Sequence, residues 1–495
     1  MRLSRRNVRA VLSFLFCIVL FSSTCCPAIA GLGQSSPPAP GNAGTLVKRA
    51  DALYESGDLA GAISAYRQAA SVRPGEPAIF FKLGLALADE GNLDEAAANY
   101  EKAATLYQKK PGEKFNYGVT LNNLGLVYSR LGRLDEALAA YRKALALSPR
   151  SADVLTRLGA ALQKKGQVDE AISVLQHAVL VKPFDADVFA ALGDAHAAGN
   201  HLDDAIAAYG RSLEIRPDTP AVLLALGNAQ QRRGLEEPAI QTLQRANQLQ
   251  PNDPETLFGL GSALTHAGRA SDAIPLLEQA QKALPERAEF LLALADALNA
   301  AGRSSEAIPV LRSALAVRPD SPEAAEALGV ALLAQGDFAG ARGLLEPAVK
   351  AHTQSPELHN DLGLALAGQR RFPEAIAEYE KALDLDPQYA DALANHAVAL
   401  TLTGRQPEAL PEFRKALELQ PKNLKAQANL AAALFGLGRY AESSEAWAKA
   451  VALSPEDGDL RYNLGLALRK AGRTAEARQA FAEARRLNPK LPTNP

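Results

Sequence analysis

The chain has 495 residues, of which 47% are hydrophobic and 22% are charged, so it can bury a core and is too apolar for a disordered protein. Its 53 Lys and Arg residues are balanced by 55 Asp and Glu residues, which removes the electrostatic basis for binding nucleic acid or an anionic membrane surface. All three cysteines lie in the first 26 residues, so the rest of the chain has no disulfide, no thiolate nucleophile and no cysteine-ligated metal.

The N-terminus has the layout of a secretory signal peptide. Four arginines precede an apolar run over 10–21, and the chain then reaches the small-residue site Ala28-Ile29-Ala30. This order predicts a signal peptide over residues 1–30 and a mature protein that is periplasmic or secreted. The alternative is an uncleaved membrane anchor over 10–29, which has about the 20 residues that a bilayer span requires. The Ser-, Pro- and Gly-rich stretch 31–42 is expected to be a flexible linker.

A repeat of 34 residues organises the rest of the chain. Prolines recur at intervals of 34 or twice 34 residues, at Pro149, Pro183, Pro217, Pro251, Pro285, Pro319, Pro387, Pro421, Pro455 and Pro489. In this register there are thirteen repeat units, two over 43–110 and eleven over 118–491, with an insert over 111–117. Residues 492–495 are a short C-terminal tail.

Each repeat unit has the pattern of two packed helices. Its eighth position is always Gly or Ala, and positions 20 and 27 are Ala in twelve of the thirteen units, so the two helices can approach closely. A Gly at position 15, present in eleven units, predicts the turn between them. Acids such as Asp135 and Glu136 suit the N-terminus of the second helix, and the proline near the end of the unit stops it. Aromatic residues at position 24, such as Tyr379 and Phe413, are predicted to lie in the core.

The repeat unit resembles the tetratricopeptide (TPR) repeat. The third unit shows the family pattern in order, with Asn123-Leu124-Gly125, Tyr128, Gly132, Ala137, Tyr141, Ala144 and Pro149. The resemblance covers 43–491. It implies an all-α, right-handed superhelical solenoid of about thirteen units, in which the first helices line a concave groove that binds proteins or peptides. Stacking agrees with this expectation, because one helical pair cannot bury its apolar face alone.

The last unit is predicted to end the stack. Positions 21 and 28 are aliphatic in most inner units, where a following unit covers them, whereas the last unit has Arg478 and Arg485 there. The two arginines make the outer face compatible with water, as a terminal repeat requires. The excess of basic residues over 458–491 is therefore interpreted as a solvated cap rather than a docking patch.

The sequence offers no enzyme motif. It has no Gly-rich phosphate loop, no His-Glu-x-x-His metal motif and no Gly-x-Ser-x-Gly elbow. His196, His359 and His396 stand where other units mainly have Leu, so they are interpreted as packing residues. The Asn-Leu-Gly pattern is similar to that of the TPR arrays of O-GlcNAc transferases, but no sequence remains after Leu491 for their catalytic domain. We expect no enzymatic activity, no cofactor and no metal.

The sharpest functional feature is a row of polar side chains on the first helices. In the family, positions 2, 5, 6, 9, 12 and 13 of the first helix tend to face the concave side. The candidates for peptide contact in the groove are Asn122, Asn123, Asn360, Asp361, Asn395, Asn429 and Asn463. Amides stacked one per unit can bond to the backbone of an extended peptide without reading its sequence. The alternative is that Asn is simply tolerated at a partly exposed helix position.

These patterns predict a non-catalytic scaffold that binds a protein or peptide segment outside the cytoplasm. Contact with nucleic acid is not expected, and membrane contact is expected only if 10–29 is retained. The alternative function is an accessory of an envelope or polysaccharide export system, because periplasmic TPR solenoids serve such systems. Glycan binding favours aromatic rings exposed along the groove. A receptor for chaperone tails is disfavoured, because positions 5 and 9 of the first unit are Val47 and Asp51.

Overall fold

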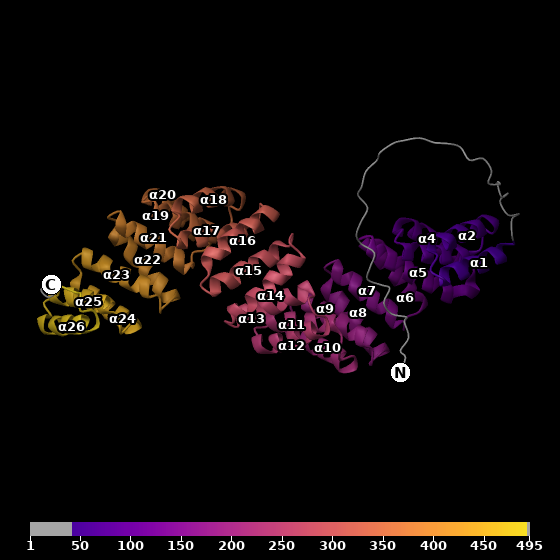
Figure 1. Ribbon diagram of the computed structural model, residues 1–495, viewed down its shortest axis with the longest axis horizontal. Helices are drawn as coiled ribbons and strands as arrows, with labels where there is room; N and C mark the ends of the chain where they lie inside the picture. Colours follow the sequence, from indigo (N-terminus) through magenta and orange to yellow (C-terminus); the bar gives the residue numbers. More distant parts are fainter. Residues whose placement is uncertain (1–41, 493–495) are drawn as a thin grey trace, which may run out of the picture. The chain divides into compact units, whose positions relative to one another are not determined.

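The computed structural model describes residues 42–492, so the predicted signal peptide, the linker up to residue 41 and the last three residues of the tail lie outside it. Within this range the chain forms 26 α-helices and one 3-10 turn, η1 (Pro111–Glu113), with no strand. Within 42–132 and within 133–492, helices that follow one another in the chain lie side by side (Figure 1). The predicted all-α solenoid of helical repeats is confirmed.

The odd-numbered helices, called A helices below, begin the repeat units, and the even-numbered helices, called B helices, complete them. The A helices are α1 (Ala43–Glu55), α3 (Pro77–Glu90), α5 (Lys114–Arg130), α7 (Ala152–Lys164), α9 (Ala186–Ala198), α11 (Pro220–Arg232), α13 (Pro254–His266), α15 (Ala288–Ala300), α17 (Pro322–Ala334), α19 (Pro356–Gly368), α21 (Ala390–Leu402), α23 (Leu424–Gly436) and α25 (Gly458–Lys470). The B helices are α2 (Leu59–Val72), α4 (Leu93–Gln108), α6 (Leu134–Leu147), α8 (Val168–Val181), α10 (Leu202–Ile215), α12 (Glu236–Leu249), α14 (Ala270–Ala283), α16 (Ser304–Val317), α18 (Phe338–Ala351), α20 (Phe372–Leu385), α22 (Gln406–Leu419), α24 (Tyr440–Leu453) and α26 (Thr474–Leu487).

The described chain divides into two compact blocks, 42–132 and 133–492. In the N-terminal block, α1 to α5 pack in chain order, each against the next. In the C-terminal block, α6 to α26 do the same, and A helices also contact one another, as α19 contacts α21 and α21 contacts α23. One core cluster of this block extends from Ala239 to Ala467. The A helices therefore form a layer of their own, and this layer carries most of the candidate site.

Two positions explain why each pair of helices closes tightly. A Cβ atom built on Gly363, at position 8, would lie 2.5 Å from the ring of Tyr379, which fills position 24 and is 1% exposed. The eleven glycines at position 15 adopt φ angles between 73° and 94°, the left-handed region that glycine enters without strain. Asn200 and Arg370 take the same place in the other two units, with φ angles of 58° and 61°.

The segment 111–117, predicted as an insert between repeat units, is helical throughout. After η1, helix α5 begins at Lys114, so the first helix of the third unit is longer than those of its neighbours. The added turn contains Tyr117, which packs against the buried side chains of Phe80 and Tyr107. This apolar contact accounts for the helical extension, because it places the ring in the core of the N-terminal block.

At the C-terminal end, the outer face of the last unit is polar. Arg478 is exposed, whereas the equivalent residues Ile376 and Leu410 of inner units are 7% and 4% exposed. The substitution of a charged side chain for an aliphatic one suits a surface that no further described helix covers.

Candidate functional site

The structure places the predicted groove residues on A helices of both blocks. Asn122 and Asn123 lie on α5 in the N-terminal block, apart in sequence from the other five. Asn360 and Asp361 lie on α19, and the remaining three follow one per A helix, Asn395 on α21, Asn429 on α23 and Asn463 on α25. Helix α19 packs beside α21 and α21 beside α23, and residues of α23 and α25 line one cavity, so the C-terminal set forms one row.

The side chains at the start of this row are hydrogen-bonded to one another. Asn395 donates from Nδ2 to Oδ1 of Asn360 over 2.9 Å, and Asn360 donates from Nδ2 to Oδ1 of Asp361 over 3.2 Å. Asn360 is only 4% exposed, and both of its polar side-chain atoms are used. Asn360 therefore links two A helices and has little capacity left for a ligand.

Asn429 and Asn463 are different, because no hydrogen bond joins either side chain to another residue of the described range. Both are half-buried. Asn463 also lines a cavity of about 150 Å³ together with Ala432, Phe435, Trp447 and Leu466, which we call the Trp447 cavity. Four apolar side chains beside one amide suit a single apolar side chain whose own backbone bonds to that amide.

The N-terminal pair is less available. Asn123 donates from Nδ2 to the carbonyl oxygen of Val119, one turn earlier on α5, over 3.1 Å. Asn122 has a buried Oδ1 without a hydrogen-bond partner. These two asparagines are not part of the row on α19 to α25.

Acidic side chains stand at the start of the row. We call Glu323 and Glu326 on α17, with Glu357 and Asp361 on α19, the acidic face. Asp361 is 6% exposed, and its burial, followed by the negative charge of Glu326, raises its pKa to about 7 against the lowering effect of the bond from Asn360. Burial also raises the pKa of Glu326, and the charges of Glu357 and Glu323 add to this. No Lys or Arg of the described chain forms an ion pair with any of the four.

Family models of the tetratricopeptide repeat match most of the chain. Models with this description match residues 76–150, 130–195, 298–362, 237–288, 258–315, 360–423 and 429–492. A further model described as TPR repeat matches 50–91 and 193–234.

The chain is a tetratricopeptide repeat protein. No curated protein matches the chain in sequence. Among solved structures, the crystal structure of the APC/C hetero-tetramer Cut9-Hcn1 is similar, with 15% identity and a TM-score of 0.46 over 91% of this chain and 95% of that one. TPR repeats generally mediate protein–protein interaction, which makes this protein an interaction scaffold by class.

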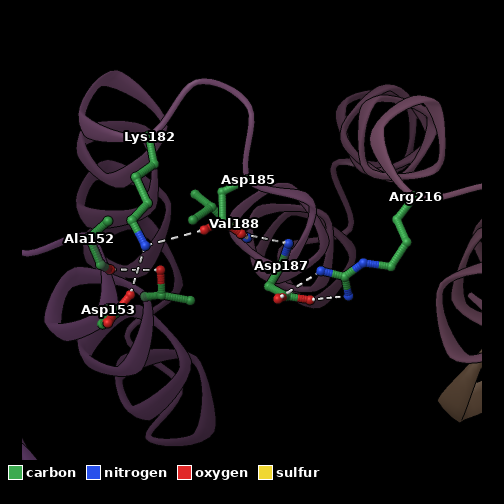
Figure 2. A network of polar contacts seen from close by, with 8 residues as sticks. Ala152, Asp153, Lys182, Asp185, Asp187, Val188 and Arg216 are labelled. Carbon is green, nitrogen blue, oxygen red and sulfur yellow. Dashed lines mark hydrogen bonds and ion pairs between the residues drawn. The ribbon is translucent and has the colours of Figure 1, made fainter.

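A recurring ion pair joins the two ends of several TPR units. The acid at position 2 of the A helix meets the base at position 31, just after the B helix. Figure 2 shows two successive examples, Lys182 with Asp153 at 3.1 Å and Arg216 with Asp187 at 2.9 Å. A third pair joins Arg318 to Glu289 at 2.6 Å. All these groups are exposed, so solvent screens each pair and its contribution to stability is small.

This pairing is absent from the units over 220–287, where Gln250 and Leu284 stand at position 31, and again from the units that carry the acidic face. The three TPR units over 322–423 keep the acid at position 2, as Glu323, Glu357 and Asp391, but replace the base at position 31. His352, Asp386 and Gln420 stand there instead. Sequence reasoning missed this feature, although the loss of the base at one fixed position of the repeat is a signal that could have revealed it.

The histidines of this region are packing residues, as the sequence indicated. His359, 4% exposed, has Nδ1 2.7 Å from an Oε2 of Glu378, and His396, 6% exposed, has Nδ1 2.9 Å from Glu412. Each contact joins the A helix of a unit to its own B helix. His196 is half-buried at the end of α9, where its ring centroid lies 5.9 Å from that of His201.

The described part of the chain, 42–492, has neither a metal-binding cluster nor a membrane-spanning helix. No group of three or more His, Cys, Asp or Glu side chains there is placed to hold a metal ion. No helix in that range is long and apolar enough to cross a membrane.

Proposed function

We propose that this TPR protein is a non-catalytic scaffold that holds an extended segment of a partner protein along helices α19 to α25. The observation that carries the proposal is the pair Asn429 and Asn463, two amides on successive A helices without an internal hydrogen bond. Asn463 lines the Trp447 cavity, which offers an apolar contact beside it. Each amide supplies both a donor and an acceptor, as a peptide backbone requires.

The spacing of the A helices fits an extended chain. Packed helices lie about 8–10 Å apart, and an extended backbone advances about 3.3 Å per residue, so one A helix corresponds to roughly three residues of the bound segment. The amides at position 6 of successive units, Asn429 and Asn463, can therefore meet equivalent backbone groups of the segment. Binding through the backbone explains how a row of identical side chains can hold partners of different sequence.

The test measures affinity for peptides selected from a random library by the mature chain. Replacing Asn429 and Asn463 together by Ala removes up to two hydrogen bonds, each worth about 0.5–1.5 kcal/mol, so the dissociation constant measured by calorimetry should rise roughly tenfold or more. Asn228→Ala, an exposed amide on α11, is the matched control and should leave affinity unchanged. If Asn429→Ala with Asn463→Ala lowers the melting temperature but not affinity, these amides have a structural role only.

An accessory role in polysaccharide export gains no support from the aromatic residues. Tyr379 is 1% exposed and Phe413 is 0% exposed, so the rings at position 24 of these units pack inside the stack and offer no face to a sugar. The proposed location outside the cytoplasm rests on the signal-peptide pattern of residues 1–30.

A further inference from the structure

We propose that the bound segment carries a lysine or arginine, and that the acidic face of α17 and α19 takes up this cationic side chain. The inference rests on the proposed function, because it names the chemistry of the segment that the groove holds. It concerns the units of α17 and α19, which are separated from the free amides of α23 and α25 by the unit of α21. A charged contact there would make the groove select for one side chain of the segment as well as bind its backbone.

The first argument is the interrupted pairing of charges along the repeats. Where Asp187 and Glu289 have Arg216 and Arg318 as partners, Glu323 and Glu357 have none in the part of the chain that the structure describes. Ser321 and Ser355 donate hydrogen bonds to the two glutamates instead, at 2.8 Å and 2.9 Å. A hydroxyl satisfies an oxygen atom without neutralising its charge, so these carboxylates remain available to a cation from outside.

The second argument is the position of Asp361. This side chain is more than nine-tenths buried, yet its only hydrogen bond is the one that Oδ1 accepts from Asn360. No described residue donates to Oδ2. A buried carboxylate without a cationic partner is unfavourable, and the proximity of Glu326 makes it more so. An ammonium or guanidinium group placed between Asp361 and Glu326 would remove both penalties.

The third argument is space. A cavity of about 510 Å³ opens beside the acidic face, lined by Glu323, Glu326 and His352 together with Pro322, Ala351, Thr353, Gln354 and Ser355. Its walls combine carboxylates with the apolar surfaces of a proline and an alanine, which suits a long side chain with an aliphatic stem and a charged end. His352 is the basic side chain in this lining, and its Nε2 donates to the carbonyl oxygen of Asp320, 2.9 Å away.

The acidic face is continuous with the amide row. The hydrogen bonds from Asn395 to Asn360 and from Asn360 to Asp361 join the two regions directly. The free amides of α23 and α25 stand two and three A helices beyond α19. At roughly three residues per A helix, the cationic residue should lie about six to nine residues from the apolar residue in the Trp447 cavity.

The experiment uses a random 16-residue phage-display library selected on the mature chain. The selected peptides should contain Lys or Arg at about six to nine residues from an aliphatic residue. Glu326→Gln with Asp361→Asn should weaken a selected peptide about tenfold to a hundredfold, the range expected for hydrogen bonds to a charged group. Replacing the basic residue of that peptide by Met should cause the same loss on the native protein and no further loss on the variant.

Asp169→Asn with Glu237→Gln is the matched control, since both acids are exposed on B helices far along the chain from the acidic face. This variant should bind as the native protein does. If the Met-substituted peptide binds the Glu326→Gln, Asp361→Asn variant more weakly than the unsubstituted peptide does, the two losses of affinity are independent and the proposal is overturned. Circular dichroism verifies that each variant is folded.

The outcomes separate this inference from the function it rests on. Selected peptides that lack basic residues but depend on Asn429 and Asn463 would overturn the inference and leave the proposed function standing. Selected peptides whose affinity does not depend on Asn429 and Asn463 would overturn the proposed function. Failure to select any peptide would count against both.

Discussion

Position 6 of the A helix shows how one atom can change the role of a side chain. Asn429 and Asp361 occupy the same place in their repeat units and have nearly the same shape. The amide can remain half-buried with its hydrogen-bonding groups free, because it carries no charge. The carboxylate is more deeply buried and faces Glu326, so its ionised form is unfavourable until a cation approaches.

The first prediction concerns Asp361 in the free protein. Its pKa is raised from 3.8 to about 7, so between these values the folded state binds the proton more strongly than the unfolded state. The contribution of Asp361 to stability should therefore fall as the pH rises from about 4 to about 7 and then stay level. Asp361→Asn should remove this fall and raise the free energy of unfolding at pH 8 by about 1–4 kcal/mol, with little change at pH 4.

Urea unfolding at pH 4 and pH 8 measures the effect. The groups that face Asp361 are Glu326 on α17, Glu357 on α19, Tyr379 on α20 and Tyr389 at the start of α21. Glu357→Gln, at an exposed site, is the control and should change the pH dependence much less. An equal gain at both pH values would show that packing, not charge, limits this site.

The second prediction separates two asparagines of the same row. Asn395→Ala removes the donor to Oδ1 of Asn360, which is buried and would be left without a partner. The free energy of unfolding should fall by about 1–3 kcal/mol. Asn429→Ala breaks no bond and should stay within about 0.5 kcal/mol of the native protein. Thermal unfolding of the two variants checks this order, and equal losses would contradict it.

At the scale of the helices, position 15 of the turn between A and B helices holds a residue other than glycine in two units, Asn200 and Arg370. Arg370 has a φ angle of 61°, in the left-handed region where side chains other than Gly and Asn are strained by roughly 1–2 kcal/mol. Arg370→Gly should therefore stabilise the protein by about 1 kcal/mol, measured by urea unfolding. The reverse change, Gly404→Ala at φ 82°, should destabilise it. If Arg370→Gly also lowers the free energy of unfolding, the surrounding structure already compensates for the backbone strain at Arg370.

Helix α18 is expected to be the weakest B helix of the C-terminal block. It contains Gly340, Gly343 and Pro347, and each glycine lowers helix stability by about 0.5–1 kcal/mol relative to Ala. A Cβ on Gly343 would meet no atom within 4 Å, so Gly343→Ala should recover that amount in thermal unfolding. Gly340 differs, because its N–H is bonded by the side chain of Asp337 at the helix start.

Hydrogen exchange tests the same weakness directly. Amides of 339–353 should exchange faster than those of 307–319, and Gly343→Ala should slow them. Helix α16 also contains a proline, Pro309, so the comparison isolates the contribution of the glycines. Equal protection in the two stretches would mean that packing compensates for them.

The 34-residue period predicts structural features that lie within one repeat unit, but it misses contacts between side chains of two adjacent units. Small residues at position 8, glycine at position 15 and aromatic residues at position 24 are visible in a single unit, and the helix pairs follow from them. The bond from Asn395 to Asn360 and the charge of Glu326 on Asp361 join adjacent units at different positions, so no periodic pattern marks them. The early start of α5 was also hidden, because it depends on Tyr117 meeting the core of the N-terminal block.

At the scale of the whole molecule, the location outside the cytoplasm stays a prediction. It matters because the location decides which partners the protein can meet. The mature chain is expected to begin at Gly31, after the small-residue site Ala28-Ile29-Ala30. N-terminal sequencing of the native protein, recovered from a cell envelope fraction, decides this. A protein that retains Arg2 to Arg9 and partitions with membranes would show that residues 10–29 act as an anchor.

The chain as a whole contains a single tryptophan, Trp447, and it lies at the wall of the cavity proposed to receive an apolar side chain. Its indole is 7% exposed, so its fluorescence should be blue-shifted and poorly quenched by acrylamide in the native state. A ligand that fills the cavity should alter this emission, whereas events elsewhere on the array should leave it unchanged. The protein thus carries an intrinsic optical probe at one defined place, and occupancy of the groove can be followed without attaching a dye.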